Sequence, residues 1–351
     1  MDSEKNLSLL LSLLSPLIKH VHKLSKTGNS KAFLRSLRSA KRRGPYVGLS
    51  NLGATCYANS VMQQLFMIPE MRVGLCSVPS QTEWKWIPKI QEMFWFLEES
   101  GFQYYKPEAF IQECSKVIEI GQQQDADEFY TLLSDRIEKE LETSESPKLL
   151  QKLFITKIDR QIICSVDHSH RTEGIEEMHA LSLEVKRMTN LREALLRYFQ
   201  GEKIHGFKCQ HCQKSVEVTK SISLLETPKN LIINLKRFEW NMETMMKEKV
   251  YDRLEFPMEI DLKEFVSRKA EPQPKHYYLY KLVGIIVHSG SADSGHYYSI
   301  IKSRGKTGNK WFCFNDSSVK EYDISNIGEE AFGDAFYHFN ERSTNAFMLF
   351  Y

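Results

Sequence analysis

Apolar and polar positions divide the chain into a helical first half and a second half rich in strands. Between Tyr46 and about Glu140, apolar residues recur every three to four positions, which is the spacing of one helix face. The clearest example is Asp125–Leu141 (DADEFYTLLSDRIEKEL). We expect helices at Cys56–Ile68, ending before Pro69, and at Ile87–Glu98, Pro107–Ile118 and Asp125–Leu141.

From about Phe154 the pattern changes to short runs of β-branched and aromatic residues. Leu231–Phe238 (LIINLKRF) is nearly all apolar in its first half and is typical of a well-buried strand. Further strands are expected at Gln161–Val166, Leu181–Val185, Glu217–Leu225, Tyr277–Val287, His296–Lys302, Trp311–Asn315 and Ala346–Tyr351. Helices followed by strands indicate an α+β fold, with the functional site between the two parts.

Residues 1–45 differ from the rest of the chain. Leu7–Ile18 is apolar, but acidic residues precede it and no small-residue cleavage site follows, and it is too short to cross a bilayer. Lys31–Arg43 (KAFLRSLRSAKRR) then carries six basic residues and no acidic one. Two interpretations of this arm stay open: a solvated, partly helical extension, or an amphipathic helix that binds a partner or an anionic surface. Gly44-Pro45 marks the boundary with a domain expected over residues 46–351.

The composition excludes several classes of protein. A net charge of +2 over 351 residues lacks the basic excess of a nucleic-acid-binding protein, so we expect no nucleic-acid partner. No other apolar run is long enough for a transmembrane segment. Seven scattered cysteines make a poor disulfide framework. They fit free thiols in a reducing compartment, the cytoplasm or the nucleus.

A candidate nucleophile lies in Gly48–Gln64 (GLSNLGATCYANSVMQQ), where a glycine-punctuated loop leads into a predicted helix at Cys56. The positive end of a helix favours a thiolate, which is the reactive form of cysteine. Asn51, five residues earlier, could aim its amide at a developing oxyanion. The alternative is a buried structural cysteine at a helix start, and a base elsewhere in the chain is needed to decide between them.

Histidines that could serve as this base occur far downstream in His288–Ile300 (HSGSADSGHYYSI), a glycine-bounded loop that leads into a strand. His296 lies at the junction of loop and strand, where a strand fixes its backbone while the loop side leaves the ring accessible. His288 is the rival, but it lies inside a predicted strand, where a local hydrogen bond would account for it. We therefore favour His296.

The strand Trp311–Asn315 follows and ends in two polar residues, Asn315 and Asp316. A hairpin between this strand and the preceding one would set Asn315 beside His296. An amide or carboxylate at that place fixes the imidazole tautomer and raises its basicity. Cysteine, histidine and asparagine follow one another in the chain order of papain-like proteases.

These segments together resemble the ubiquitin-specific proteases, a family of papain-like deubiquitinases. The cysteine box of that family is matched by Gly48–Gln64, and its histidine box by Val287–Ile300 with Trp311–Asp316. Similar stretches lie at Gln122–Phe129, Leu231–Phe238, Leu254–Leu262 and the final AFMLFY. The resemblance covers about residues 46–351, in order throughout. The continuation QQLFMIPEMR most resembles catalytic domains of the very large, fat facets-type members.

The resemblance implies a thiol protease that hydrolyses the isopeptide or peptide bond after the C-terminal glycine of ubiquitin, through an acyl-enzyme at Cys56. It also implies a hand-like fold, with a helical thumb at about 46–150 and β fingers and a β palm at about 151–351. Ubiquitin and ubiquitinated proteins are the expected partners. A catalytically inactive ubiquitin-binding module and a protease for another ubiquitin-like modifier remain as alternatives.

The resemblance also assigns roles by position. His296 corresponds to the general base, Asn315 to the third member of the triad, Asp316 to a supporting polar residue and Asn51 to the side chain of the oxyanion hole. Some family members carry aspartate where this chain has Asn315. Because an amide stabilises imidazolium less than a carboxylate does, we expect a more modest activity.

In the family, the segment matched by Gln124–Phe129 helps to hold the basic C-terminal tail of ubiquitin. Asp125 and Glu128 are three positions apart and share a helix face, so both could pair with arginines on the substrate. The alternative is a helix N-cap followed by an acid in the first turn. Both interpretations can hold for Asp125.

A zinc site is also indicated. Cys209 and Cys212 form a CxxC knuckle suited to tetrahedral zinc, and many family members place a second CxxC opposite it. The corresponding stretch here is CSVDHSH, and we favour a site made of Cys164, His168, Cys209 and Cys212. The alternatives replace His168 by Asp167 or His170, or leave the fingers without metal. One such zinc would be structural, and none is needed for the chemistry, because four protein ligands leave no open position.

Overall fold

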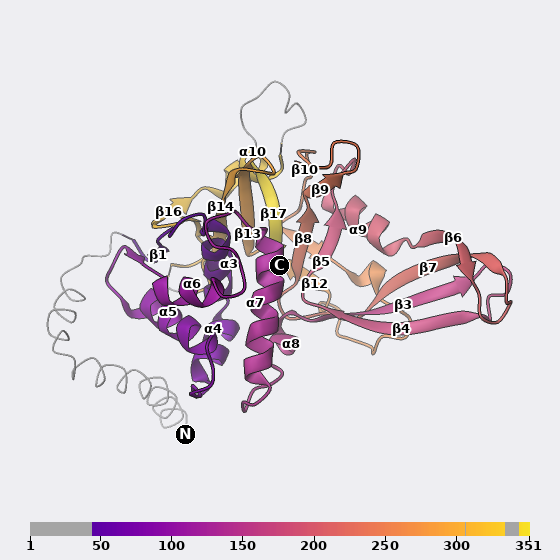
Figure 1. Cartoon of the computed structure of the whole chain (residues 1–351), viewed down its shortest axis with the longest axis horizontal. Coiled ribbons are helices and arrows are strands. Elements are labelled where there is room, and N and C mark those ends of the chain that lie inside the picture. Colours follow the sequence, from indigo (N-terminus) through magenta and orange to yellow (C-terminus); the bar gives the residue numbers. More distant parts are fainter. Residues whose placement is uncertain (1–43, 306, 334–343) are drawn as a thin grey trace. The chain divides into compact units, whose positions relative to one another are not determined.

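The computed structural model describes residues 44–305, 307–333 and 344–351 (Figure 1). The predicted arm therefore lies, apart from its last two residues, outside the described part of the chain. Contacts divide the chain into two compact units. One contains the residues up to Leu150 together with His296–Asp323, and the other contains Gln151–Gly295 together with Ile324–Tyr351.

The first unit is mainly helical, with helices α3 (Cys56–Phe66), α4 (Pro69–Ser77), α5 (Ile87–Glu99), α6 (Glu108–Cys114) and α7 (Ala126–Leu141). The four helices expected from the sequence are confirmed. Helix α4 was not expected, because Pro69 was interpreted only as the end of the preceding helix. Proline in a first helical turn is favourable, since its ring already has a helical φ and it lacks an N–H that would have no partner.

Helix α3 lies at the centre of this unit, and all of its residues are buried. Helix α7 contacts it, with the rings of Tyr57 and Phe129 5.3 Å apart. At the other end of α7, the Glu140 carboxylate accepts hydrogen bonds from the backbone N–H groups of Trp86 (2.9 Å) and Ile87 (2.8 Å). One acid therefore caps the start of α5 and ties two helices together.

Three antiparallel strands complete the first unit: β14 (Gly295–Lys302), β15 (Trp311–Asn315) and β16 (Ser318–Tyr322). The Ser299 hydroxyl donates to the Ser60 carbonyl oxygen at 3.0 Å, which attaches β14 to α3. Two further strands, β1 (Gly48–Leu49) and β2 (Tyr104–Tyr105), form a short parallel pair in which Gly48 is opposite Tyr104.

Gly48 makes an unusually close approach to the turn after β15. A Cβ atom at position 48 would lie 2.6 Å from the Asp316 carbonyl oxygen and 2.5 Å from the Ser317 carbonyl carbon. The next residue, Leu49, donates its backbone N–H to that same Asp316 oxygen at 2.9 Å. Glycine is therefore needed at position 48 for lack of space.

The second unit contains a four-stranded antiparallel sheet of order β4-β3-β7-β6, made of β3 (Thr156–Cys164), β4 (Arg171–Met178), β6 (Glu202–Lys208) and β7 (Ser215–Glu226). Its four strands are labelled in Figure 1. A second set of strands contains β13 (Gly284–Gly290), β17 (Asn345–Phe350), β8 (Ile232–Lys236) and β5 (Leu181–Glu184). In this order, each strand pairs with the next. The α+β class is therefore confirmed.

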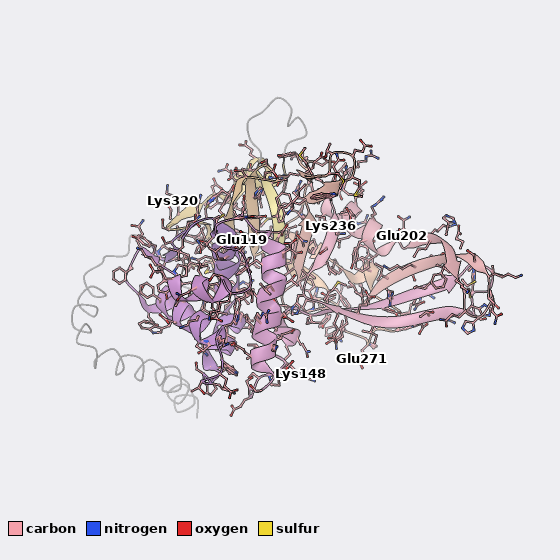
Figure 2. All side chains as sticks on the ribbon, viewed as in Figure 1. Glu119, Lys148, Glu202, Lys236, Glu271 and Lys320 are labelled. Atoms are coloured by element: carbon pink, nitrogen blue, oxygen red, sulfur yellow. The ribbon has the colours of Figure 1, made fainter. Side chains whose placement is uncertain are left out.

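Smaller elements join these sheets: α8 (Leu149–Phe154), α9 (Leu191–Phe199), α10 (Ile327–Ala331), and the strand pairs β9 (Phe238–Asn241) with β10 (Met246–Lys249) and β11 (Glu259–Asp261) with β12 (Leu279–Lys281). The expected strand Tyr277–Val287 is two strands, β12 and β13. Charged side chains such as Lys148 and Glu202 are exposed (Figure 2). Within the described residues, every helix is too short or too polar to cross a membrane.

Candidate active site and metal site

Cys56 is the first residue of α3, as the sequence predicts, and is 3% exposed. The loop before it is held by Asn51, whose Oδ1 accepts hydrogen bonds from the backbone N–H groups of Gly53 (3.0 Å) and Thr55 (3.1 Å). Gly53 has a φ of 103°, in the left-handed region that glycine adopts without strain. The thiol therefore lies at a helix N-terminus, and the Asn51 amide fixes the shape of the loop that precedes it.

His296 and Asn315 meet across the hairpin of β14 and β15. The His296 Nε2 and Asn315 Oδ1 atoms are 2.8 Å apart. An amide oxygen can only accept, so Nε2 is the donor and Nδ1 is the ring nitrogen available to a thiol. A hydrogen bond with Cys56 raises the pKa of His296 to about 9, in opposition to burial, and the bond with Asn315 adds to the increase. The protonated imidazole is therefore favoured beside Cys56.

The rival histidine has a different environment within the second unit. His288 is 1% exposed, and its Nδ1 lies 2.9 Å from the Nζ of Lys249. Lys249 also donates to the carbonyl oxygens of His288 (3.2 Å) and Gly290 (3.0 Å). The ring of His288 is thus part of a buried structural contact, as the alternative interpretation of this residue expected.

Asp316 is bonded more closely to asparagines than to His296. Its Oδ2 accepts from the Nδ2 of Asn51 at 3.1 Å, and its Oδ1 accepts from the Nδ2 of Asn59 at 2.8 Å. The distance from Oδ2 to the His296 Nε2 is 3.9 Å. Asn59 was not singled out from the sequence, although its place one helical turn after Cys56 on α3 was a usable signal.

The acidic segment at the start of α7 has mixed roles. Asp125 is the N-cap, and its Oδ1 accepts from the backbone N–H of Asp127 at 2.8 Å, so the capping interpretation is confirmed. Glu128 is exposed. Burial, together with the charges of Asp125 and Glu128, raises the pKa of Asp127 to about 6. The helix start therefore carries three acids close together, whose charges raise the pKa of the buried one.

Four potential metal ligands gather in the second unit. One ligand atom from each of Cys164, His170, Cys209 and Cys212 lies within 4.8 Å of the others. Cys164 ends β3 and His170 immediately precedes β4, whereas both remaining cysteines lie in the turn between β6 and β7. Three thiols and one imidazole this close together are a donor set that could hold a structural zinc.

The structure brings His170, and not the favoured His168, to the three cysteines, and this difference has a geometric cause. The backbone N–H of Cys164 bonds to the His170 carbonyl oxygen at 3.0 Å, so these two residues are partners at the base of a hairpin. His168 is exposed in the turn between them. Asp167 accepts from the N–H (2.9 Å) and hydroxyl (2.7 Å) of Ser169 and so closes the turn.

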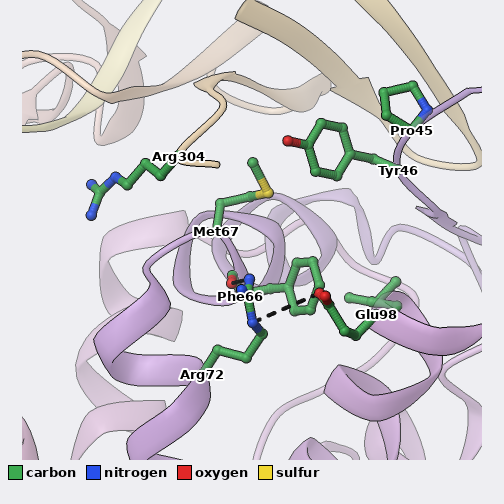
Figure 3. Close-up of a pocket in the computed structure, with 8 residues that line it drawn as sticks. Pro45, Tyr46, Phe66, Met67, Arg72, Glu98 and Arg304 are labelled. Carbon is green, nitrogen blue, oxygen red and sulfur yellow. Dashed lines mark hydrogen bonds and ion pairs between the residues drawn. The ribbon is translucent and has the colours of Figure 1, made fainter. Parts of the chain in front are cut away.

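A small pocket in the first unit shares no residue with the candidate site (Figure 3). Arg72 and Arg304 contribute the positive charge of its lining. Arg72 lies 3.8 Å from the Glu98 carboxylate and donates to the Phe66 carbonyl oxygen at 3.0 Å. Because an acid of the same lining offsets the charge of Arg72, we assign no ligand to this pocket.

Cys56, at the start of a helix, is hydrogen-bonded to His296, and His296 to Asn315. This arrangement is that of a thiol-protease site. The family model "Ubiquitin carboxyl-terminal hydrolase" matches residues 47–351. The chain belongs to this family.

Curated relatives are much longer than this chain. It is 33% identical over 347 residues to human ubiquitin carboxyl-terminal hydrolase 34, a match that covers 87% of this chain and 10% of the relative. It is 31% identical over 367 residues to ubiquitin carboxyl-terminal hydrolase puf of Drosophila melanogaster, covering 87% and 9%. Mouse ubiquitin carboxyl-terminal hydrolase 9X is 29% identical over 399 residues, covering 87% and 16%. The expected resemblance to very large members is confirmed.

Proposed function

We propose that this chain is a thiol-dependent deubiquitinase that hydrolyses the isopeptide or peptide bond after the C-terminal glycine of ubiquitin. The hydrogen-bonded series from Cys56 through His296 to Asn315, in a member of this family, carries the proposal. The helices of the unit that holds this series correspond to the thumb, and its strands β14, β15 and β16 to part of the palm. The β4-β3-β7-β6 sheet corresponds to the fingers, and the other strands of the second unit to the palm.

The proposed reaction has two steps. The Cys56 thiolate attacks the carbonyl carbon of the terminal glycine and forms a C–S bond, while the oxyanion receives a hydrogen bond from the Asn51 amide. His296 then gives its proton to the departing amine as the C–N bond breaks, which leaves a thioester. Water attacks the thioester, His296 takes the proton of the water, and the ubiquitin carboxylate and free thiol are restored.

Asn315 and Asp316 both stabilise His296, but in different ways. Asn315 fixes the tautomer at 2.8 Å but carries no charge, whereas the Asp316 carboxylate is 3.9 Å from the ring nitrogen. Imidazolium is therefore stabilised by a neutral contact partner and a more distant anion. This arrangement supports an active but modest hydrolase.

Ubiquitin carrying a C-terminal electrophile provides the direct test. We expect covalent capture at Cys56, identified by peptide mapping, and no capture by the same electrophile on other ubiquitin-like modifiers. Capture of a different modifier alone would replace ubiquitin as the substrate. Absence of capture by every modifier would contradict the proposed activity.

Acidic residues at the start of α7 are proposed to bind the basic tail of ubiquitin. Asp125→Asn keeps an N-cap while it removes the charge, and Glu128→Gln removes the exposed charge. A charge-assisted contact contributes about 1.5–3 kcal/mol, so we expect KM for ubiquitin substrates to rise by about ten- to a hundredfold.

The matched control is Asp135→Asn, which removes an exposed acid further along the same helix. Steady-state kinetics on ubiquitin conjugates should leave this variant near the wild-type KM. If all three variants keep the wild-type KM, the acids at positions 125 and 128 have a capping role only.

We also propose that one structural zinc occupies the site formed by Cys164, His170, Cys209 and Cys212. The Nε2 of His170 lies 3.5 Å from an Asp167 carboxylate oxygen, and its Nδ1 lies 3.2 Å from the Cys212 sulfur. A carboxylate on the outer ring nitrogen is the usual support of a histidine that ligates metal. Cysteine chemistry of this kind fits a reducing compartment, the cytoplasm or the nucleus.

Zinc content and thermal stability should separate His170 from its neighbour. Cys209→Ser combined with Cys212→Ser, and His170→Ala alone, are expected to lower the zinc content and the melting temperature, because the metal joins two hairpins. His168→Ala, two positions away and exposed, is the matched control and should keep one zinc per chain. Elemental analysis of protein purified without chelator measures this. A metal content near zero in the wild type would contradict the zinc proposal.

A further inference from the structure

Asn59 has a buried amide aimed at the candidate active site. It lies on α3, one helical turn after Cys56, and is 3% exposed. Its Nδ2 donates to the Asp316 Oδ1 at 2.8 Å and lies 3.4 Å from the Leu49 carbonyl oxygen. A buried amide with two acceptors on one nitrogen has a defined orientation, so Asn59 is a rigid support on a rigid helix.

Asp316, the acceptor of this bond, is held at both its backbone and its side chain. Its φ of 48° lies in the left-handed region, and its carbonyl oxygen accepts from the Leu49 N–H at 2.9 Å. Of its two carboxylate oxygens, one accepts from Asn59 and the other from Asn51. The plane of the carboxylate is therefore defined by two amides on opposite oxygens, and loss of one lets it rotate about the other.

Asn51, at the end of the series, is held at its amide oxygen by the loop before Cys56 and at its amide nitrogen by Asp316. A primary amide nitrogen carries two hydrogens. One is donated to the Asp316 Oδ2 at 3.1 Å, and the other is the donor available to a substrate oxygen. The direction of this second N–H depends on the carboxylate that receives the first.

We propose that Asn59 is a positioning residue for the oxyanion-binding amide: through Asp316, it sets the direction in which Asn51 donates. This inference rests on the proposed thiol-hydrolase function. Asn59 does not touch the reacting atoms. Its effect passes along two hydrogen bonds, 2.8 Å from Asn59 to Asp316 and 3.1 Å from Asn51 to Asp316.

The series predicts a selective kinetic defect. An oxyanion forms only during acyl transfer, so poor alignment of Asn51 should lower kcat and leave KM for ubiquitin substrates unchanged. Direct loss of an oxyanion donor costs about 10²–10³ in kcat, and we expect Asn59→Leu to cost about ten- to a hundredfold because the donor is misdirected rather than absent. Alkylation of Cys56 by iodoacetamide forms no oxyanion and should keep its wild-type rate.

A matched control lies on the same helix. Gln63 is 2% exposed, one turn beyond Asn59, and its amide donates to the Val47 carbonyl oxygen at 3.0 Å rather than to Asp316. Gln63→Met should lower the melting temperature as much as Asn59→Leu does, yet keep the wild-type kcat. If Asn59→Leu does not fold, Asn59→Asp, of nearly equal volume, replaces it and should show the same loss of kcat.

A double-mutant cycle tests the route through Asn51. If Asn59 acts through this amide, Asn59→Leu combined with Asn51→Ala should turn over no more slowly than Asn51→Ala alone. Fully additive losses would overturn the inference, as would wild-type kcat in both Asn59 variants or a parallel loss of iodoacetamide reactivity. Capture of wild-type protein by the ubiquitin electrophile is scored separately, so failure of the proposed function is distinguishable from failure of this inference.

Discussion

Replacement of Cys56 by alanine is expected to abolish cleavage of ubiquitin conjugates and to leave ubiquitin binding largely intact. The thiolate supplies the electrons for the C–S bond of the acyl-enzyme, and no neighbouring group can replace it. The residues proposed to bind the substrate are others, among them the acids at the start of α7. Turnover and affinity should be measured on the same purified variant, the affinity by calorimetry with ubiquitin.

The control for this substitution is another cysteine of the first unit. Burial raises the pKa of Cys76 to about 11, so this residue remains a thiol at neutral pH. Cys76→Ala should therefore keep wild-type turnover and full capture by the ubiquitin electrophile. Cleavage that persists in Cys56→Ala, or disappears in Cys76→Ala, would move the nucleophile elsewhere.

His296→Ala is expected to be nearly as damaging as loss of the thiol, because the members of such a site act as a unit. It removes the partner that stabilises the thiolate and the acid that protonates the leaving amine. Asn315→Ala should cost less, since the Cys56–His296 contact remains. Hydrolysis of a fluorogenic ubiquitin substrate measures both. A mild effect of His296→Ala combined with a fatal effect of His288→Ala would show that the base was assigned wrongly.

The pH profile gives a second measurement on the same histidine. The pKa of His296 is raised from 6.5 to about 9, first by Cys56, so its imidazolium form persists through neutral pH. The raised pKa stabilises the folded state with His296 protonated. This contribution to folding stability is complete below pH 6.5 and is lost as the pH rises through about 9. We expect kcat/KM to fall across that alkaline range. Asn315→Ala removes one contribution that raises the pKa, so it should shift the fall to lower pH.

The helical unit and the positions of the candidate catalytic residues could be predicted because their signals are local. The apolar spacing in α7, and the glycine-bounded segments that hold Cys56 and His296, specify their own conformation over a few residues. Strand β4 was missed because its residues are all exposed or half-exposed, so no apolar face marks it. Asn59 was not singled out because the residue that it contacts, Asp316, lies 257 positions away.

The proposed fourth zinc ligand shows the same limit at shorter range. Spacing from Cys164 allowed either His168 or His170, and both interpretations satisfy the chemistry of zinc. The choice depends on the hydrogen bond between the backbones of Cys164 and His170, which makes them hairpin partners. Turn closure of this kind is not encoded in the identity of the ligands, so the sequence analysis favoured His168 over His170.

Gly48 has a consequence for the way mutational data on this chain should be interpreted. It has no functional group, but even the methyl group of alanine would lie 2.6 Å from the carbonyl oxygen of Asp316. In a saturation mutagenesis experiment, substitutions at position 48 should therefore be as damaging as substitutions of a residue that reacts with the substrate. Without the structure, such data would suggest that Gly48 is a catalytic residue. The structure shows instead that substitutions fail there because there is no space beside the backbone.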